Sequence, residues 1–361
     1  MQLFSVDQDI SVARTLNTDF YLDSRVYPTI MEKIFSRSWQ LAGDQAFVQH
    51  TGECFPFTLL PGSLEEPLLL TRDKFGITHC LSNVCTHRGN ILVNEHCNQP
   101  HLRCRYHGRL FNLDGEFHSM PEFKEVKDFP DRTDSLSKLP LASWHSLLFT
   151  SLNPLVDFAT LMGDMIQRLH WLPLEQFTIR PELSMKFDVD ANWALYCENY
   201  LEGFHIPFVH AGLNSVIDFG SYTTELFNYS NLQLALAKND QLNFDLPSTS
   251  VDHGKRVAAF YFFVFPNMMF NFYPWGLSVN IVEPKSIDKT TVRFLYYVWK
   301  NDIFGPGAGS DLDTVEKEDE EVVNAVQKGI RSRFYRHGRY SVTREQGTHH
   351  FHRILGEFMS K

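Results

Sequence analysis

The chain has 361 residues, of which 43% are hydrophobic and 14% aromatic, and its formal net charge is −10. That length exceeds a single small module of roughly 100 residues, so we expect two domains. The excess of acidic residues speaks against nucleic acid as a partner, because phosphate binding requires a basic face.

The N-terminal part of the chain is expected to contain a helix followed by a small β domain. Over residues 28–39 apolar side chains recur at helical spacing, and Pro28 suits the first turn of a helix. From about 41 to 152 the pattern changes to short apolar runs divided by Gly, Pro and Asn, with the hairpin signal Asp114-Gly115. These patterns predict a helical segment over 1–40, packed on the C-terminal domain, and an all-β domain over 41–152.

Two loops of this β domain each carry one cysteine and one histidine. Cys85 and His87 belong to Cys-Thr-His-Arg-Gly, and Cys104 and His107 belong to Cys-Arg-Tyr-His-Gly. Two thiolates and two imidazoles suit a [2Fe–2S] centre in which cysteines hold one iron and histidines hold the other. A Cys₂His₂ zinc site would use the same ligands. Zinc fingers usually pair Cys with Cys and His with His, so the spacing favours the iron–sulfur cluster.

Residues 153–361 mix helical and extended patterns. Long strands followed by a terminal helix predict an α+β domain whose curved antiparallel sheet wraps around a pocket. The glycine-rich stretch 305–310 predicts a loop at the pocket rim. The expected strands are 183–190, 223–237, 257–265, 276–284 and 290–299, and the expected helices are 155–170, 192–206, 314–334 and 343–359.

A second group of metal-binding residue types follows in 192–210. On one helix, Glu198, Glu202 and His205 would stand at i, i+4 and i+7 and share a face. Pro207 would break that helix and allow His210 to reach back toward His205. Two imidazoles and one carboxylate form a facial triad that leaves open positions on Fe(II). The alternative is a buried polar network in which these side chains satisfy one another.

Together the two motifs resemble the catalytic α subunit of the Rieske non-haem iron oxygenases, the aromatic-ring-hydroxylating dioxygenase family. The resemblance covers nearly the whole chain and implies a helix-grip (START-like) catalytic domain over 153–361. It implies that His205 and His210 bind a mononuclear iron, with Asn199 beside it and Glu202 as a bridging carboxylate. The family's Asn-Trp-Lys has Ala194 in place of its lysine here. The Glu-x-x-His version resembles the choline, carnitine and betaine monooxygenase branch.

The third iron ligand implied by the resemblance lies in an acidic run downstream. The segment 316–330 is similar to the family's acidic helix that ends in Val-Gln-x-Gly-Leu. Aligning it on Gln327 and Gly329 places the ligand at Asp319, and a slip of one residue would place it at Glu320. The other carboxylates of the run are expected to be solvated helix surface: Glu316, Glu318 and Glu321.

The resemblance implies a terminal oxygenase component that uses O₂ to hydroxylate or oxidatively demethylate a small organic substrate. The chain has no Gly-x-Gly-x-x-Gly dinucleotide fingerprint, so electrons must come from a separate reductase, directly or through a ferredoxin. Glu202 and the aromatic strand over 271–275 favour a quaternary ammonium substrate, because aromatic rings attract such cations. Oxygenation of an aromatic ring, as a mono- or dioxygenase, and a non-catalytic Rieske electron-transfer protein are the alternatives.

Assembly and location follow from the resemblance and from composition. The family implies a homotrimer in which Glu202 hydrogen-bonds His205 and His107 of a neighbouring chain. No apolar run approaches the ~20 residues that a membrane helix needs. The first residues lack a signal peptide's basic and apolar regions, and the six cysteines show no disulfide framework. A cytoplasmic protein is therefore expected.

Overall fold

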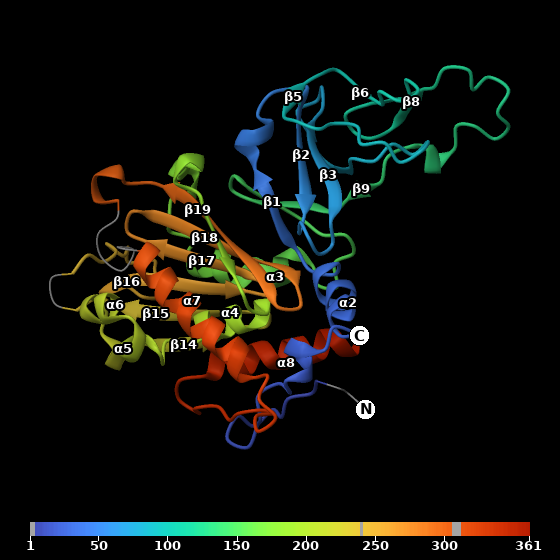
Figure 1. Cartoon of the computed structure of the whole chain (residues 1–361). Helices are drawn as coiled ribbons and strands as arrows, with labels where there is room; N and C mark the ends of the chain where they lie inside the picture. Colours follow the sequence, from blue (N-terminus) through green and yellow to red (C-terminus); the bar gives the residue numbers. More distant parts are fainter. Residues whose placement is uncertain (1–3, 239–240, 305–311) are drawn as a thin grey trace. The chain divides into compact units, whose positions relative to one another are not determined.

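The computed structural model describes residues 4–238, 241–304 and 312–361 (Figure 1). It divides into two compact units, one formed by Ser36–Leu155 and the other by Met1–Phe35 together with Val156–Lys361. The loop expected over 305–310 lies outside the described residues. Among the helices that the structure describes, none has the length and apolar character needed to cross a membrane.

The unit formed by Ser36–Leu155 is built from antiparallel strands in three small sheets. Their orders are β1-β11-β10, β5-β2-β3-β4-β9 and β6-β7-β8. A core that includes Leu69, Leu81 and Phe111 also encloses Cys85 and Cys104. The strands are β1 Gln40–Asp44, β2 Glu53–Leu59, β3 Glu66–Arg72, β4 Thr78–Ser82, β5 Cys97–Asn98, β6 Leu102–Arg103, β7 Leu110–Phe111, β8 Phe117–Ser119, β9 Lys138–Leu139, β10 Leu141–Trp144 and β11 Leu147–Thr150.

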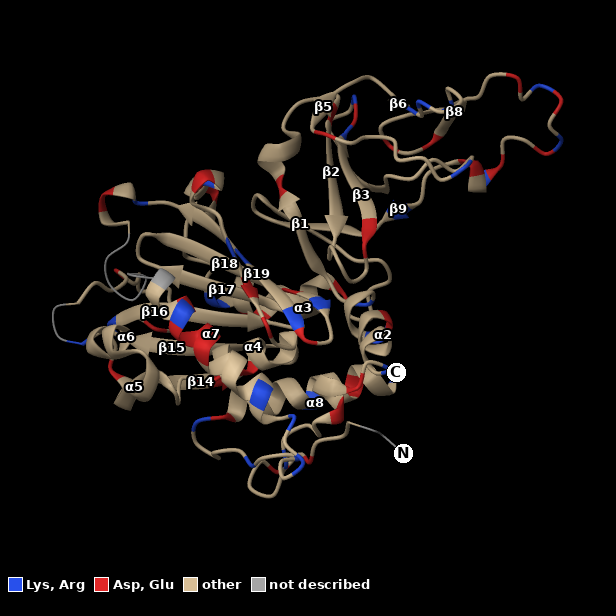
Figure 2. Ribbon diagram, in the orientation of Figure 1, with Lys and Arg blue, Asp and Glu red and all other residues tan. Residues whose placement is uncertain are grey.

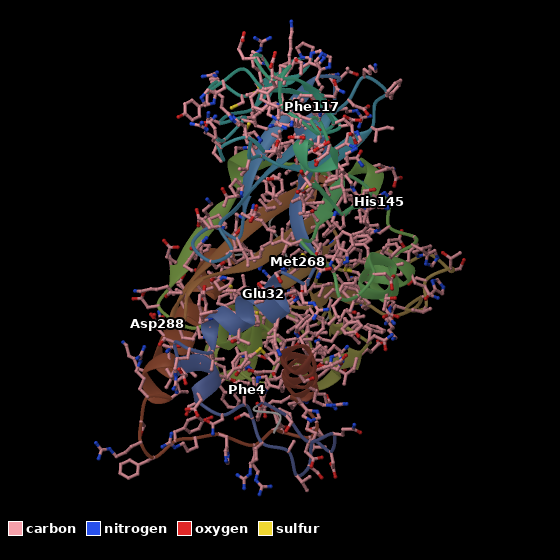
Figure 3. All side chains as sticks on the ribbon, turned by 90° about the vertical axis from the view of Figure 1, so that its right-hand side faces the viewer. Phe4, Glu32, Phe117, His145, Met268 and Asp288 are labelled. Atoms are coloured by element: carbon pink, nitrogen blue, oxygen red, sulfur yellow. The ribbon has the colours of Figure 1, made fainter. Side chains whose placement is uncertain are left out.

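The other unit is organised around an eight-stranded antiparallel sheet. Its order is β12-β19-β18-β17-β16-β15-β14, and β13 also pairs with β19. Strands β16 and β17 are buried throughout, and Met268 of β17 lies among densely packed side chains (Figure 3). Their aromatic and β-branched residues suit such strands. The strands are β12 Thr178–Ile179, β13 Met185–Val189, β14 Thr223–Leu226, β15 Ser230–Leu236, β16 Val257–Val264, β17 Met268–Tyr273, β18 Gly276–Ser286 and β19 Lys289–Val298.

Helices of the same unit pack against this sheet and carry the acidic run. Helix α3 contacts β15 and β16, α4 contacts β18 and α7, and α8 contacts β14. Helix α7 begins with the acidic residues that are red in Figure 2. The helices are α1 Asp19–Leu22, α2 Tyr27–Ile30, α3 Phe158–Arg168, α4 Trp193–Tyr200, α5 Ile206–Val209, α6 Ala211–Val216, α7 Leu312–Gly329 and α8 Gln346–Ser360.

The predicted α+β class, with an all-β unit and an antiparallel sheet with helices, is confirmed. The strand expected over 271–275 is β17 and the helix expected over 314–334 is α7, with shifted bounds, and three other elements differ more strongly from expectation. The strand expected over 223–237 is a hairpin of β14 and β15, because the chain turns where the Phe227 N–H donates to the Ser230 carbonyl at 2.9 Å. The helix expected over 28–39 becomes a π-helix at Met31–Phe35 and then ends, so that Gln40 begins β1.

The third difference concerns the helix expected over 192–206, which ends at Tyr200. The Glu202 carboxylate accepts hydrogen bonds from the backbone N–H groups of Phe204 and His205, so it replaces the helical partners of those groups. Gly203, a weak helix former, allows the chain to turn against Tyr222, where a Cβ would approach the ring to 2.6 Å. The expected common helix face for Glu198, Glu202 and His205 was therefore wrong.

Helix α8 fixes the end of α4, and this contact gives a stability prediction. A Cβ at Gly347 would overlap the carbonyl oxygen of Leu201, the residue before Glu202. We expect Gly347→Ala to destabilise the protein by about 1–3 kcal/mol and lower its melting temperature, because backbone must move to accept the methyl group. Gly163→Ala in α3 is the matched control, since a Cβ there meets nothing within 4 Å. It should stabilise by about 0.5–1 kcal/mol, and equal melting temperatures for the two variants would contradict the prediction.

Candidate functional site

The two Cys–His loops have the same local backbone structure. The N–H of Gly89 donates to the carbonyl of Cys85 at 3.0 Å, and the N–H of Gly108 donates to that of Cys104 at 3.0 Å. Both glycines have positive φ, 72° and 78°, a region that favours glycine. The repeated Gly in the two motifs therefore closes two equivalent turns that present one thiol and one imidazole each.

These turns place the thiols inside the unit and the imidazoles toward its surface. Cys85 and Cys104 are each 2% exposed, whereas His87 is half-buried and His107 is exposed. The two imidazole ring centroids lie 4.8 Å apart. Burial raises the pKa of Cys85. Burial acts the same way on Cys104, but hydrogen bonds from the Tyr106 N–H, the Cys85 thiol, the His107 N–H and the Asn90 side chain together outweigh it and lower the pKa of that thiol.

Arg109, which the sequence analysis did not single out, braces the second loop. Its guanidinium is 2% exposed and donates to the backbone carbonyl of Asp134 at 3.0 Å. The same group pairs with the Asp134 carboxylate, so the buried charge is compensated. Three rings surround it, those of Phe111, Phe117 and Phe129, of which Phe117 is labelled in Figure 3.

The second unit brings His205, His210 and Asp319 together. The Nε2 atoms of the two histidines lie 3.1 Å apart. Asp319 Oδ1 lies 3.0 Å from Nε2 of His210 and 3.5 Å from Nε2 of His205. His205 precedes α5, His210 follows it, and Asp319 comes from α7. Glu320, the alternative ligand, is not a member of this group.

The outer nitrogen of each imidazole is held by a separate carboxylate. Glu202 Oε1 lies 2.8 Å from Nδ1 of His205, and Glu318 Oε2 lies 2.7 Å from Nδ1 of His210. If each Nδ1–H donates to its carboxylate, both Nε2 atoms present lone pairs to the Asp319 oxygen. Three acceptors at 3.0–3.5 Å repel one another unless a cation lies among them. The donor set therefore fits a divalent iron.

The electrostatic environment of His210 also favours positive charge. Burial by itself lowers the pKa of this imidazole, but Asp319 and Glu318 outweigh burial and raise it. His210 is 1% exposed, so water contributes little to this balance. A cation among the three ligand atoms would balance the negative charges of Asp319 and Glu318 in place of a proton on the His210 ring.

Three carboxylates of the region are not where the sequence analysis expected them. Glu198 points away from the triad, because its Oε1 accepts from Tyr21 at 2.7 Å and lies 3.0 Å from Nε2 of His352. Glu316 and Glu318 were expected at the solvated surface, which was wrong: Glu316 is 4% exposed, and Glu318 contacts His210. Glu321 is exposed, as expected. For Glu316 the sequence does carry a signal: it stands seven residues before the buried Val323 and so lies on the same face of α7.

Helices α4 and α7 meet through two hydrogen bonds between side chains. Asn199 Nδ2 donates to Asp319 Oδ1 at 2.6 Å, which orients the carboxylate of the triad. One turn earlier on both helices, the Tyr196 hydroxyl donates to Glu316 Oε2 at 2.6 Å. The other oxygen of Glu316, Oε1, is buried and has no hydrogen-bond partner among the described residues. Burial raises the pKa of Glu316 to about 8.

A cavity of about 110 Å³ adjoins the triad and includes it in its wall. Asn271 of β17 accepts from the Tyr200 hydroxyl at 2.7 Å, and Gln233 of β15 accepts from the Tyr222 hydroxyl at 3.2 Å. No lysine or arginine is among the described residues that line it. The wall also contains aromatic, small polar, aliphatic and acidic side chains: Tyr196, Tyr261, Tyr273, Phe294, Ser278, Asn280, Ile206, Leu213, Val315, Glu202 and Glu316.

Comparison with known families matches both units. Residues 38–130 match the Rieske [2Fe-2S] domain, and residues 169–361 match the ring hydroxylating alpha subunit (catalytic domain). The first match contains both Cys–His loops, and the second contains the His–His–Asp triad and the cavity.

Sequence similarity to curated proteins extends over nearly the whole chain. The chain is 30% identical to the chloroplastic choline monooxygenase of Beta vulgaris over 359 residues, which cover 96% of this chain and 77% of that protein. It is 24% identical to the carnitine monooxygenase oxygenase subunit of Escherichia coli (strain K12), over 96% of this chain and 94% of that protein.

Solved structures show the same fold at lower identity. The quaternary ammonium Rieske monooxygenase CntA, in complex with L-carnitine, superposes with a TM-score of 0.76 at 20% identity, covering 97% of each chain. Naphthalene 1,2-dioxygenase from Rhodococcus sp., bound to indole, gives a TM-score of 0.75 at 18% identity, covering 95% of this chain and 94% of that one.

Proposed function

This chain belongs to the Rieske oxygenases with a ring-hydroxylating α-subunit catalytic domain, and on that premise we propose that it oxidises a small quaternary ammonium compound. As the terminal oxygenase, it carries a Rieske [2Fe–2S] cluster and a mononuclear iron and requires an electron-transfer partner. The observation that carries the substrate proposal is the cavity beside the triad, whose described wall has aromatic rings and carboxylates but no lysine or arginine.

We assign the ligands from the two donor sets. Cys85 and Cys104 hold one iron of the cluster, and His87 and His107 hold the other. His205, His210 and Asp319 would hold the mononuclear iron at the wall of the cavity. A 2-His-1-carboxylate triad is the usual protein site for Fe(II) that must bind oxygen and leave room for a substrate.

The carboxylates of the cavity wall favour a cationic substrate over an aromatic hydrocarbon. Glu202, Glu316 and Asp319 line the cavity, and no lysine or arginine is among the described residues of its wall, so the wall attracts positive charge. A trimethylammonium head carries its charge over its methyl groups and can lie against tyrosine rings by cation–π attraction. Two relatives are named for quaternary ammonium substrates, choline and carnitine, which supports this proposal.

In the proposed reaction, one C–H bond of the substrate becomes C–OH, and O₂ is split with two electrons and two protons so that its second oxygen leaves as water. The iron supplies this oxygen chemistry when bound. The chain's own residues orient it: Glu202 and Glu318 hold the two imidazoles, and Asn199 holds the Asp319 carboxylate. Hydroxylation of an N-methyl carbon would be followed by C–N cleavage. Formaldehyde leaves, nitrogen keeps the electron pair, and the hydroxyl proton passes to solvent.

Electron supply and assembly form the second part of the proposal. We propose that a separate reductase reduces the cluster and that the chains form a head-to-tail homotrimer. In that trimer Glu202 would hydrogen-bond both His205 and His107 of a neighbouring chain. One CntA structure is described as giving insights into inter-subunit electron transfer. The six cysteines are free, which supports a reducing compartment such as the cytoplasm.

The substrate class can be tested by product detection with a surrogate reductase. We expect one of choline, glycine betaine or carnitine to give an oxidised product with matching O₂ consumption, and benzoate to give none. Hydroxylated benzoate as the sole product would support the aromatic-ring alternative. Reduction of the cluster without product from any compound, in a protein with two rather than three irons per chain, would support an electron carrier.

A further inference from the structure

We infer that Glu316 is the substrate-binding residue that pairs with the cationic head group, which it holds beside the mononuclear iron. This inference rests on the proposed function. It adds a named residue for charge recognition and fixes which end of the substrate approaches the metal.

The geometry of Glu316 leaves one oxygen for a ligand. The residue lines the cavity and is 4% exposed, and the Tyr196 hydroxyl already occupies Oε2 at 2.6 Å. Oε1 is buried and has no hydrogen-bond partner in the described part of the chain. A buried polar oxygen without a partner destabilises the fold, so its retention at a cavity wall points to a ligand that satisfies it.

The charges around the cavity point to a cation as that ligand. Asp319, Glu202 and Glu318 carry up to three negative charges, against the two positive charges of one ferrous ion. Burial raises the pKa of Glu316 to about 8, so near neutral pH a cation at Oε1 would displace a proton from this carboxyl and pair with a fourth negative charge. Glu202 and Glu318 each contact a histidine, and Asp319 contacts both histidines and Asn199. The Glu316 carboxylate is therefore the one whose negative charge these contacts leave uncompensated. The rings of Tyr196 and Tyr273 in the same wall would add cation–π attraction.

The position of Glu316 on α7 orients the substrate. Glu316 and Asp319 are three residues apart on one helix, so their side chains emerge about 5–6 Å apart on the same face. An ammonium group at Oε1 would thus lie next to the metal. The substrate carbons bonded to the ammonium nitrogen, or one bond further away, would then be within reach of the iron site. This placement predicts oxidation at the head group rather than at the remote end of the substrate.

Binding of choline and of its uncharged carbon isostere, 3,3-dimethylbutan-1-ol, to the iron-loaded enzyme tests the inference by calorimetry. The wild type should bind choline more tightly than the alcohol. Glu316→Gln keeps the side-chain shape, so it should bind the alcohol as before but lose roughly tenfold or more of the preference for choline. Glu316→Asp keeps the charge and should retain part of the preference. Glu321→Gln removes an exposed charge from the same helix and should change nothing.

The outcomes separate this inference from the proposed function. If Glu316→Gln retains its iron and the full preference for choline, Glu316 is not the cation's partner, although the enzyme can still oxidise a quaternary ammonium compound. If the wild type turns over none of the quaternary ammonium panel and does not prefer choline to the alcohol, both are wrong. Loss of iron in Glu316→Gln and Glu316→Asp alike would show that Glu316 supports the metal site instead.

Discussion

Asp319→Ala is expected to remove the mononuclear iron and to lower turnover by at least about a thousandfold, because the remaining imidazoles cannot complete the facial triad. The cluster lies in the other unit, so its visible absorbance should persist while iron falls from about three to about two per chain. Metal analysis and product formation measured on the same preparation test both parts of this prediction.

Glu320→Ala is the matched control for Asp319→Ala. The two carboxylates are neighbours on α7, but Asp319 faces the histidines, whereas Glu320 is not a member of the group. We expect Glu320→Ala to keep its iron and most of its turnover. If Glu320→Ala loses the iron and Asp319→Ala keeps it, the helix is rotated by one residue from the register proposed here. If both variants keep their mononuclear iron, α7 does not supply the third ligand.

The cluster loops could be predicted from sequence because their geometry is local. Each loop contains its two candidate ligands and a glycine within five residues, and the turn is closed by the hydrogen bond between that glycine and its cysteine. The family prediction based on these loops and on the 192–210 motif was confirmed by the matches to both domain families. Short-range patterns therefore sufficed for fold class, cofactors and reaction type.

The local structure around the triad depends on contacts distant in sequence, and there the prediction failed. Asp319 and His210 are 109 residues apart, and their distance depends on how α7 packs on α4. That packing also buries Glu316 and brings Glu318 to His210, although both carboxylates belong to a run typical of a solvated face. The early end of α4 combines a local cause, the Glu202 carboxylate that accepts from the N–H groups of Phe204 and His205, with a distant one, the approach of Gly347 of α8 to Leu201.

With iron in excess, Glu202→Gln is expected to leave both metal centres bound and to lower product formation by roughly 100-fold. Glu202 holds Nδ1 of His205 and the backbone N–H of that residue, and a glutamine keeps its shape but not its charge. If Glu202 also joins His205 to a neighbour's cluster, the loss should appear as slow oxidation of the reduced cluster when O₂ and substrate are added. Stopped-flow absorbance of the cluster, with product measured after a single turnover, records this step.

Comparison of Glu202→Gln with Glu318→Gln distinguishes two roles of Glu202, a bridge to a neighbour's cluster and a partner that only orients His205. Glu318 makes the equivalent contact to Nδ1 of His210, at 2.7 Å against 2.8 Å for Glu202 and His205, but we assign it no link to the cluster. Both variants should weaken iron binding, by about tenfold to 100-fold, since each removes a charged partner of a ligand imidazole. With iron in excess, however, Glu202→Gln alone should slow cluster oxidation. If the two variants slow it equally, Glu202 only orients His205, and electrons reach the iron by a route that does not need its carboxylate.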